Sequence, residues 1–145
     1  MTVKIVKLDP SAHLPTYGSA SAAGADLYAC IEKPVSILPG QTQMIPTRLS
    51  MEIEEGFAGF IYARSGLASK RGLAPANKVG VVDSDYRGQV MVALHNHSQA
   101  PQFVEPGERI AQMVFAPVYQ AQFCLVESLQ DTERGAGGFG STGTK

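Results

Sequence analysis

The residues that could carry chemistry lie mostly at the ends of apolar segments, and Asp83 is the clearest of them. It directly follows the apolar segment Val79–Val82 and begins the polar turn 83–88. A carboxylate held at a strand end can orient a water molecule and remove a proton from it, and an acidic neighbour such as Asp85 makes it a stronger base. Because hairpin turns also prefer Asp and Gly, a plain turn is the alternative.

A second candidate is the triplet Arg64-Ser65-Gly66, which lies where a predicted strand is followed by a predicted helix. The first N–H groups of a helix have no partner within it and attract anions, and an arginine and a serine hydroxyl strengthen such a site. The alternative is an ordinary helix start, in which Ser65 caps the helix and Arg64 lies on the surface. The triplet therefore predicts either an anion site or a simple cap.

The C-terminal segment combines five glycines with four groups that suit a nucleotide: Arg134, Phe139, Ser141 and Thr142. Its GAGGFG run matches the dinucleotide pattern GxGxxG, but that pattern needs a following helix, and only five residues remain after Gly140. Glycine lets backbone N–H groups converge on an anion, arginine grips phosphate with two bonds, and an aromatic ring stacks on a base. The segment is predicted to be a lid over a nucleotide, the alternative being a flexible tail.

Other polar positions are less specific. Asp26 lies among small residues, and Arg109 and Gln112 lie in an apolar segment where both could simply be solvated. His95 and His97 would share one face of a strand and form half of a metal site, but no nearby Glu completes it. Polar residues at a strand end are the favoured interpretation of the two histidines.

The elements that must position these residues are mainly short β-strands. Apolar side chains alternate with polar ones along residues 47–53 and 90–94, which predicts strands with one buried face. One short helix is expected, at Ser65–Arg71, ending at Gly72. Further strands are predicted at Val3–Leu8, Phe57–Ala63, Val79–Val82, Arg109–Phe115 and Phe123–Val126. Short strands joined by Gly and Pro turns predict an all-β sandwich, jelly roll or barrel.

Composition bounds the class of protein. The 145 residues, with 12 Lys+Arg against 13 Asp+Glu, predict one domain, placed at 1–130 with a Gly-rich arm at 131–145. The net charge of -1 argues against a nucleic-acid or polybasic membrane partner. No apolar run reaches the roughly 20 residues of a membrane span, and no signal peptide is evident, so a cytoplasmic location is expected. Cys30 and Cys124 lie too far apart to indicate a zinc site or disulfide scaffold.

Five segments together resemble the ordered motifs of the trimeric dUTP diphosphatases. This resemblance implies a jelly-roll-like fold of the β-clip type and a homotrimer with active sites at the subunit boundaries, each covered by a neighbour's tail. It also implies Mg²⁺-assisted hydrolysis of dUTP to dUMP and pyrophosphate, which limits uracil incorporation into DNA and supplies dUMP for thymidylate synthesis. The segments are AGADLYA (23–29), RSG (64–66), NKVGVVDSDYRG (77–88), GERIAQM (107–113) and RGAGGFGSTG (134–143).

The resemblance also implies residue roles. Asp83 would activate the water that attacks the α-phosphorus, and Asp26 would contact the water shell of Mg²⁺ held mainly by the phosphates. Tyr86 would pack on the deoxyribose, and the role of Arg109 stays open. The phosphate chain would be held by Arg64, Ser65, Gly66, Gln112, Arg134, Gly140, Ser141 and Thr142. The uracil would be bound by Asn77, Gly80, Val81, Val82 and Met91, with Phe139 stacked over it.

Three alternatives remain on sequence alone. A dCTP deaminase of the same fold would differ at residues 83–86, and no matching Glu is found for its deamination step. A nucleotide-binding regulator without catalysis is possible, although all the proposed chemical residues are present. A cupin-like metal protein would require tight metal binding by His95 and His97.

Overall fold

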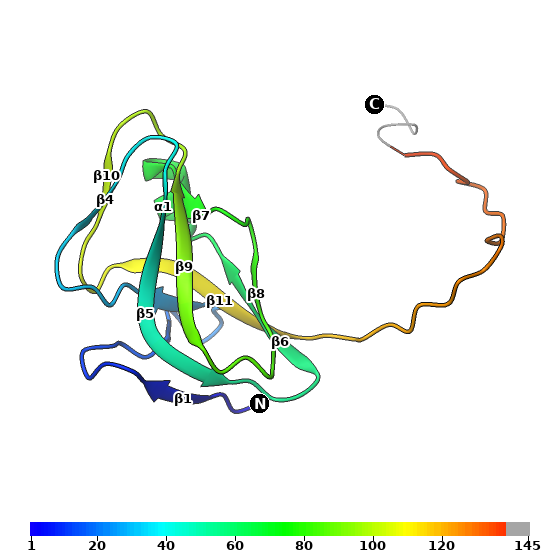
Figure 1. The fold of residues 1–145 in the computed structure, drawn as a ribbon, viewed down its shortest axis with the longest axis horizontal. Coiled ribbons are helices and arrows are strands. Elements are labelled where there is room, and N and C mark those ends of the chain that lie inside the picture. The colour runs from blue at the N-terminus through cyan, green and yellow to red at the C-terminus, as the bar shows by residue number, and fades with distance from the viewer. Residues whose placement is uncertain (139–145) are drawn as a thin grey trace.

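A computed structural model of the chain describes residues 1–138, which form eleven strands in three antiparallel sheets and one short helix (Figure 1). One sheet has the strand order β1-β5-β9-β7, the second β2-β3-β11-β6-β8, and the third pairs β10 with β4. The strands are β1 (Lys4–Lys7), β2 (Thr16–Tyr17), β3 (Ala25–Tyr28), β4 (Val35–Ile37), β5 (Thr42–Glu52), β6 (Phe57–Tyr62), β7 (Leu73–Pro75), β8 (Gly80–Val82), β9 (Gln89–Asn96), β10 (Gln102–Val104) and β11 (Arg109–Pro117).

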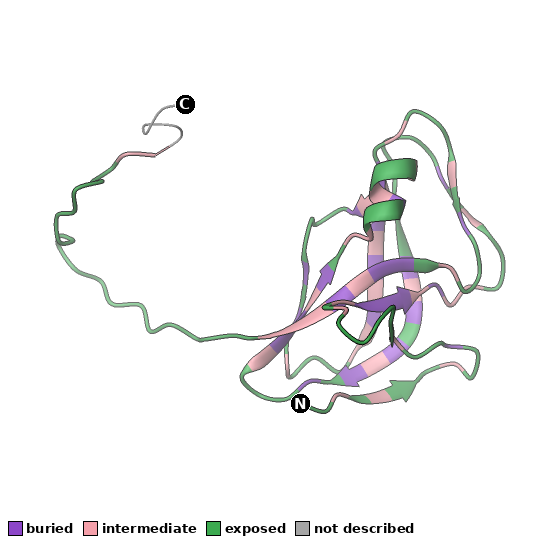
Figure 2. Cartoon of the chain, turned by 180° about the vertical axis from the view of Figure 1, so that it is seen from behind, coloured by how far each residue is buried: buried purple, intermediate pink, exposed green. Residues whose placement is uncertain are grey.

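The core is formed by the faces that the sheets turn toward each other. The predicted alternation is confirmed on β5, where Leu49 and Met51 are buried while Arg48 and Glu52 are exposed. Purple, buried positions alternate with the others along these strands in Figure 2. Leucine, isoleucine and valine side chains from all three sheets meet there, and their burial is the main favourable contribution to folding. They include Leu27, Ile37, Ile45, Leu73, Val90, Val92, Leu94, Val104 and Ile110.

A β-bulge in β5 bends the longest strand. The register against β9 shifts between Pro46 and Leu49, and Arg48 within this interval has a positive φ of 55°. The buried hydroxyl of Thr47 donates a 2.7 Å hydrogen bond to the carbonyl oxygen of Val90 across the bulge. Residues 42–46 of β5 therefore pair with β9 alone, residues 49 and 50 pair with both β9 and β1, and residues 51 and 52 pair with β1 alone.

The predicted helix is confirmed with the expected bounds. Helix α1 (Ser65–Arg71) ends at Gly72, whose φ of 67° is the left-handed conformation that glycine adopts most easily. Arg64 is its N-cap residue and makes no side-chain capping bond, so the interpretation of Ser65 as a capping residue is wrong. Leu67 anchors the helix in the core, which leaves Ser65 and Gly66 exposed at its start.

The segment after β11 leaves the sheets and runs away from them (Figure 1). The predicted strand at Phe123–Val126 is wrong: these residues form no strand, and Phe123 and Leu125 are 98% and 101% exposed. The division into 1–130 and 131–145 stays a prediction. Within the described residues, no helix is long and apolar enough to cross a membrane.

Candidate functional site

A pocket of about 280 Å³ lies between β8 and β9, two consecutive strands that belong to different sheets. Among the described residues, β8 pairs only with β6, and β9 pairs with β7 only through residues 94–96, so both strands leave a backbone edge without a strand partner there. Such edges carry N–H and C=O groups that can bind the polar edge of a flat ring. Seven predicted site residues line this pocket together: Asn77, Gly80, Val81, Val82, Asp83, Tyr86 and Met91.

Asp83 stands at the rim of this pocket. It follows β8 directly and is exposed, and its carboxylate makes no hydrogen bond or ion pair within residues 1–138. Both oxygens are therefore available to accept bonds from a water molecule. The prediction that Asp83 lies at the end of a strand is confirmed.

Tyr86 is held in a defined orientation on the turn between β8 and β9. Its hydroxyl donates a 3.0 Å hydrogen bond to the carbonyl oxygen of Gln89. The phenol group lies against Gly88, where a Cβ would be 2.3 Å from the tyrosine Oη and 2.5 Å from Cζ. The absence of a side chain at Gly88 is thus what allows the ring to lie here.

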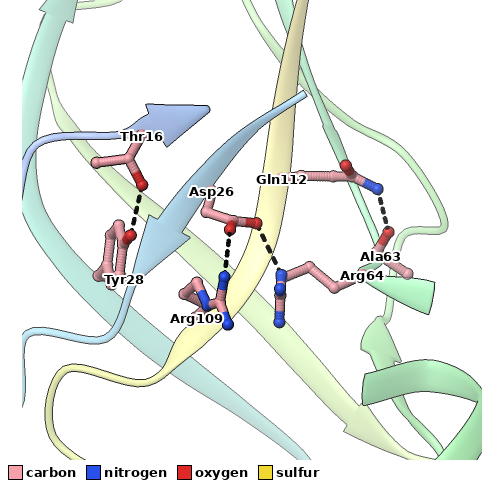
Figure 3. Close-up of polar contacts among 7 residues, drawn as sticks. All are labelled: Thr16, Asp26, Tyr28, Ala63, Arg64, Arg109 and Gln112. Atoms are coloured by element: carbon pink, nitrogen blue, oxygen red, sulfur yellow. Dashed lines mark hydrogen bonds and ion pairs between the residues drawn. The ribbon is translucent and has the colours of Figure 1, made fainter. Parts of the chain in front are cut away.

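A second pocket, of about 260 Å³, is centred on Asp26 and gathers the other predicted polar residues. The Asp26 carboxylate, 12% exposed, receives a 2.7 Å bond from Nε of Arg64 on one oxygen and a 3.2 Å bond from Arg109 on the other (Figure 3). Strands β3 and β11, neighbours in one sheet, place Asp26 and Arg109 together. The pocket is lined by Gly18, Ala22, Gly24, Asp26, Arg64, Ser65, Gly66, Arg109 and Gln112.

This second pocket contains positively charged and N–H donor groups that could bind an anion. Because Arg64 contacts Asp26 through Nε, its two terminal nitrogens stay available for a phosphate. The Gln112 amide donates a 2.9 Å bond to the carbonyl oxygen of Ala63, which fixes its side chain beside them (Figure 3). Gln112 also lies close to Gly24: a Cβ at position 24 would be 2.5 Å from the Gln112 Oε1, so any larger residue there would displace the Gln112 carboxamide.

The predicted site residues thus fall into two groups on one chain, and the remainder lie elsewhere. Asp83 and Tyr86 line the first pocket, whereas Arg64 and Gln112 line the second. Arg134 is exposed in the C-terminal segment, where its Nε donates to the carbonyl oxygen of Gly137. Phe139, Gly140, Ser141 and Thr142 lie outside the described residues.

The sequence analysis missed Gln89 and assigned no role to Arg109. Arg109, whose role was left open, is now placed as the second partner of Asp26. Gln89 was not a candidate, yet it lines the pocket between β8 and β9. The sequence contains no functional signal for either residue, because Arg109 begins a predicted strand and Gln89 directly precedes one, and polar residues are ordinary at both places.

The described residues do not form a preassembled metal cage. Within residues 1–138, no three His, Cys, Asp or Glu side chains are grouped to hold a metal ion. The rings of His95 and His97 contact edge to face at 4.4 Å, and the Thr42 hydroxyl lies 2.9 Å from Nδ1 of His95. Burial, followed by the charges of His95 and Lys78, lowers the pKa of His97 below its usual value. Within the described residues, the two histidines therefore have no third side chain with which to form the metal site of a cupin-like protein.

The fold and the two pockets define an all-β protein with one pocket between two strand edges and a separate pocket that contains two arginines. The dUTPase family model matches residues 10–143. The chain belongs to the dUTPase family, which confirms the predicted family, its jelly-roll-like fold and its enzyme class.

Individual relatives agree with this assignment. Deoxyuridine 5'-triphosphate nucleotidohydrolase of Desulfitobacterium hafniense is 51% identical over 97% of this chain and 94% of its own. The enzyme of the same name from Serratia proteamaculans is 52% identical over 90% of this chain and 86% of its own. A solved structure of a Staphylococcus bacteriophage 80alpha dUTPase G164S mutant with dUpNHpp has a TM-score of 0.90, 26% identity and 99% coverage of both chains.

Proposed function

We propose that the chain hydrolyses dUTP to dUMP and pyrophosphate, with Asp83 activating the attacking water. Membership of the dUTPase family supports the reaction, and the phage relative with dUpNHpp supports the substrate. The residue assignment rests on the position of Asp83, which lines the slot between β8 and β9 and whose carboxylate has no partner within residues 1–138. Hydrolysis of the nucleotide would limit uracil incorporation into DNA and supply dUMP, and its nucleotide substrate suits a cytoplasmic location.

The slot between β8 and β9 is the proposed uracil site. Uracil would place its carbonyl groups against backbone N–H donors of these strand edges, near Asn77, Gly80 and Val82, while Val81 and Met91 line the slot. Cytosine reverses the donors and acceptors at this edge, which leaves buried groups unpaired at about 1–3 kcal/mol each. The methyl group of thymine would be rejected by contact with the narrow walls.

The pocket around Asp26 is the proposed phosphate site. Arg64 and Gln112 point into it, with the Ser65 hydroxyl and the Gly66 N–H at the start of α1. Positively charged donors fixed in advance stabilise the charge that develops in phosphoryl transfer without reorganising during the reaction. The ion pair with Asp26 fixes the Arg64 guanidinium, so that Asp26 acts first as its positioning residue.

Mg²⁺ is proposed to bind mainly through the substrate phosphates. Both Asp26 oxygens are already paired with arginines, and the described residues include no group of three His, Cys, Asp or Glu side chains that could hold a metal ion. A contact through water therefore suits Asp26 better than direct ligation. When bound, Mg²⁺ supplies neutralisation of the phosphate charge. Arg64 and Gln112 then orient the phosphate chain toward Asp83.

A homotrimer is proposed because one chain holds the two half-sites as separate pockets. The exposed segment after β11 carries large apolar side chains at Tyr119, Phe123, Leu125 and Leu129, which gain stability when another subunit covers them. The Gly-rich arm, 131–145, would then close over a neighbour's site, with Arg134, Gly140, Ser141 and Thr142 on the phosphates and Phe139 on the uracil.

Pyrophosphate release tests the proposed function. With Mg²⁺ present, we expect release from dUTP and release at least about a hundredfold slower from UTP, dCTP, dTTP and ATP. Ammonia release from dCTP would instead establish a deaminase. Tight dUTP binding without any release would establish a regulator.

Gly88→Ala should weaken the selection of deoxyribose. The glycine has no positive φ, so alanine fits the backbone, but its Cβ would displace the Tyr86 ring and break the bond to Gln89. We expect the ratio of kcat/KM for dUTP over UTP to fall by about tenfold. Ser84→Ala on the same turn is the control, since the Ser84 hydroxyl makes no hydrogen bond within the described residues. An unchanged ratio would show that Tyr86 does not select the sugar.

A further inference from the structure

His95 and His97 form a pair of imidazole rings at the end of β9 that lies away from the slot. Side chains two residues apart on an extended strand lie on the same face, with their Cα atoms roughly 6–7 Å apart. The two rings lean closer than this, with centroids 4.4 Å apart in an edge-to-face arrangement. His95 is half-buried and His97 is exposed, and neither lines the slot or the pocket around Asp26. The proposed hydrolysis of dUTP therefore gives this pair no role.

The backbone that carries the two rings is held on both sides. His95 is paired with β5 on one side and with β7 on the other, and the backbone N–H of His97 donates a 2.8 Å bond to the carbonyl oxygen of Gly72. Between the two histidines, the side chain of Asn96 is fully buried and donates two 2.8 Å hydrogen bonds to backbone carbonyl oxygens. Because the segment is rigid, ligands on it are positioned before an ion arrives.

The Thr42 hydroxyl orients the His95 ring. Thr42 lies directly opposite His95 in the register of β5 and β9, and its hydroxyl oxygen is 2.9 Å from Nδ1. When Nδ1 carries the proton and donates to this hydroxyl, Nε2 presents its lone pair to a ligand. A histidine that binds a metal almost always donates its other ring N–H to a neighbouring acceptor in this way.

The His97 ring is available as a second ligand near neutral pH. A histidine must be neutral to bind a metal. Desolvation of the ring, followed by the charges of His95 and Lys78, lowers the pKa of His97, so the neutral form predominates at pH 7. The positive charge of Lys78 also repels a bound cation, so we expect moderate rather than tight affinity.

The spacing of the rings fits two ligands of one metal ion. Two imidazoles that bind neighbouring positions of Zn²⁺, at about 2.0–2.1 Å from each nitrogen, have ring centroids roughly 4.5–5 Å apart. We propose that His95 and His97 form a two-imidazole site for a divalent transition-metal ion such as Zn²⁺, Ni²⁺ or Cu²⁺, with water in the remaining positions. Imidazole favours these ions, whereas Mg²⁺ prefers oxygen ligands, so the site is distinct from the Mg²⁺ proposed on the substrate phosphates.

Calorimetric titration of the full-length, nucleotide-free protein with Zn²⁺ tests this inference. We expect one ion per chain with a Kd on the order of 10–100 μM, because the second imidazole binds intramolecularly once the first is bound. His97→Gln should raise this Kd at least about tenfold, since one imidazole alone remains. His95→Gln should repeat the loss and keeps the test valid if one variant folds poorly. Cu²⁺ should bind more tightly than Zn²⁺, and millimolar Mg²⁺ should displace neither ion.

His13→Gln is the matched control. It removes the third histidine of the chain, which lies before β2 with its ring centroid 5.4 Å from that of Tyr28, and it should keep the wild-type affinity. With one equivalent of Cu²⁺, the electron paramagnetic resonance spectrum of the wild type should show coupling to two imidazole nitrogens, reduced to one in His97→Gln.

Four results would each overturn the inference. They are equal Zn²⁺ affinity in the wild type and His97→Gln, an equal loss of affinity in His13→Gln, displacement of Zn²⁺ by millimolar Mg²⁺, and no Zn²⁺ binding below about 1 mM. Because every readout is metal binding without nucleotide, failure of the protein to hydrolyse dUTP would leave this inference standing and count against the proposed function instead.

Discussion

Asp83→Asn should reduce kcat for dUTP by about 10²–10⁴-fold, the usual contribution of a general base. Asparagine keeps the size of the side chain and one carbonyl oxygen, but it cannot take a proton from the attacking water. Because Asp83 is exposed and makes no ion pair within the described residues, the substitution breaks no contact that stabilises the fold. Single-turnover pyrophosphate release measures the chemical step directly.

Binding separates this catalytic role from a structural one. The Kd for dUTP in Asp83→Asn should stay within a few-fold of wild type, or decrease, because a negative charge near the phosphates has been removed. Asp85→Asn is the matched control: it makes the same chemical change two residues later, at a residue that does not line the slot between β8 and β9. If Asp83→Asn retained full turnover, Asp83 would have no part in activating water. If both variants were equally slow, general disturbance of the turn would explain the loss.

The sequence predicted the parts of the fold in which local pattern and burial agree. Along β5, the alternation of Leu49 and Met51 with Arg48 and Glu52 gives the correct buried face. Strands of two or three residues, such as β2 and β7, have no pattern of their own and exist because a longer neighbour pairs with them. The bulge at Arg48 was also not predictable, because it depends on the register against β9.

The predicted strand at Phe123–Val126 shows a different limit. Its apolar residues are typical of a strand, but strand pairing requires a partner that sequence cannot specify. Within the described part of one chain this partner does not exist, and Phe123 is 98% exposed. Apolar residue type alone was therefore not sufficient evidence for a strand at this position.

The candidate site was predictable by residue type and only partly by geometry. Asp26 and Arg64 were both candidates. Nothing in the sequence indicates, however, that these two residues, 38 positions apart, form a 2.7 Å ion pair. Arg109 contacts the other oxygen of Asp26 because its strand, β11, pairs with β3. Long-range juxtapositions of this kind come from sheet order, which motifs do not contain.

Removal of residues 133–145 should reduce kcat/KM for dUTP at least about a hundredfold, through loss of the phosphate contacts proposed for Arg134 and its neighbours. The described part of this segment makes only local hydrogen bonds, such as those from Arg134 and Gly135, so the β core should keep its melting temperature. The proposed trimer should also persist in the truncated protein, since Phe123 and Leu125 are retained.

Arg134→Ala in the full-length chain is the matched variant, because it keeps the glycines and removes one charge. A smaller loss in Arg134→Ala than in the truncation would assign the difference to closure by the rest of the arm. Full activity without residues 133–145 would leave the two pockets of the β core sufficient for catalysis and remove the arm from the reaction.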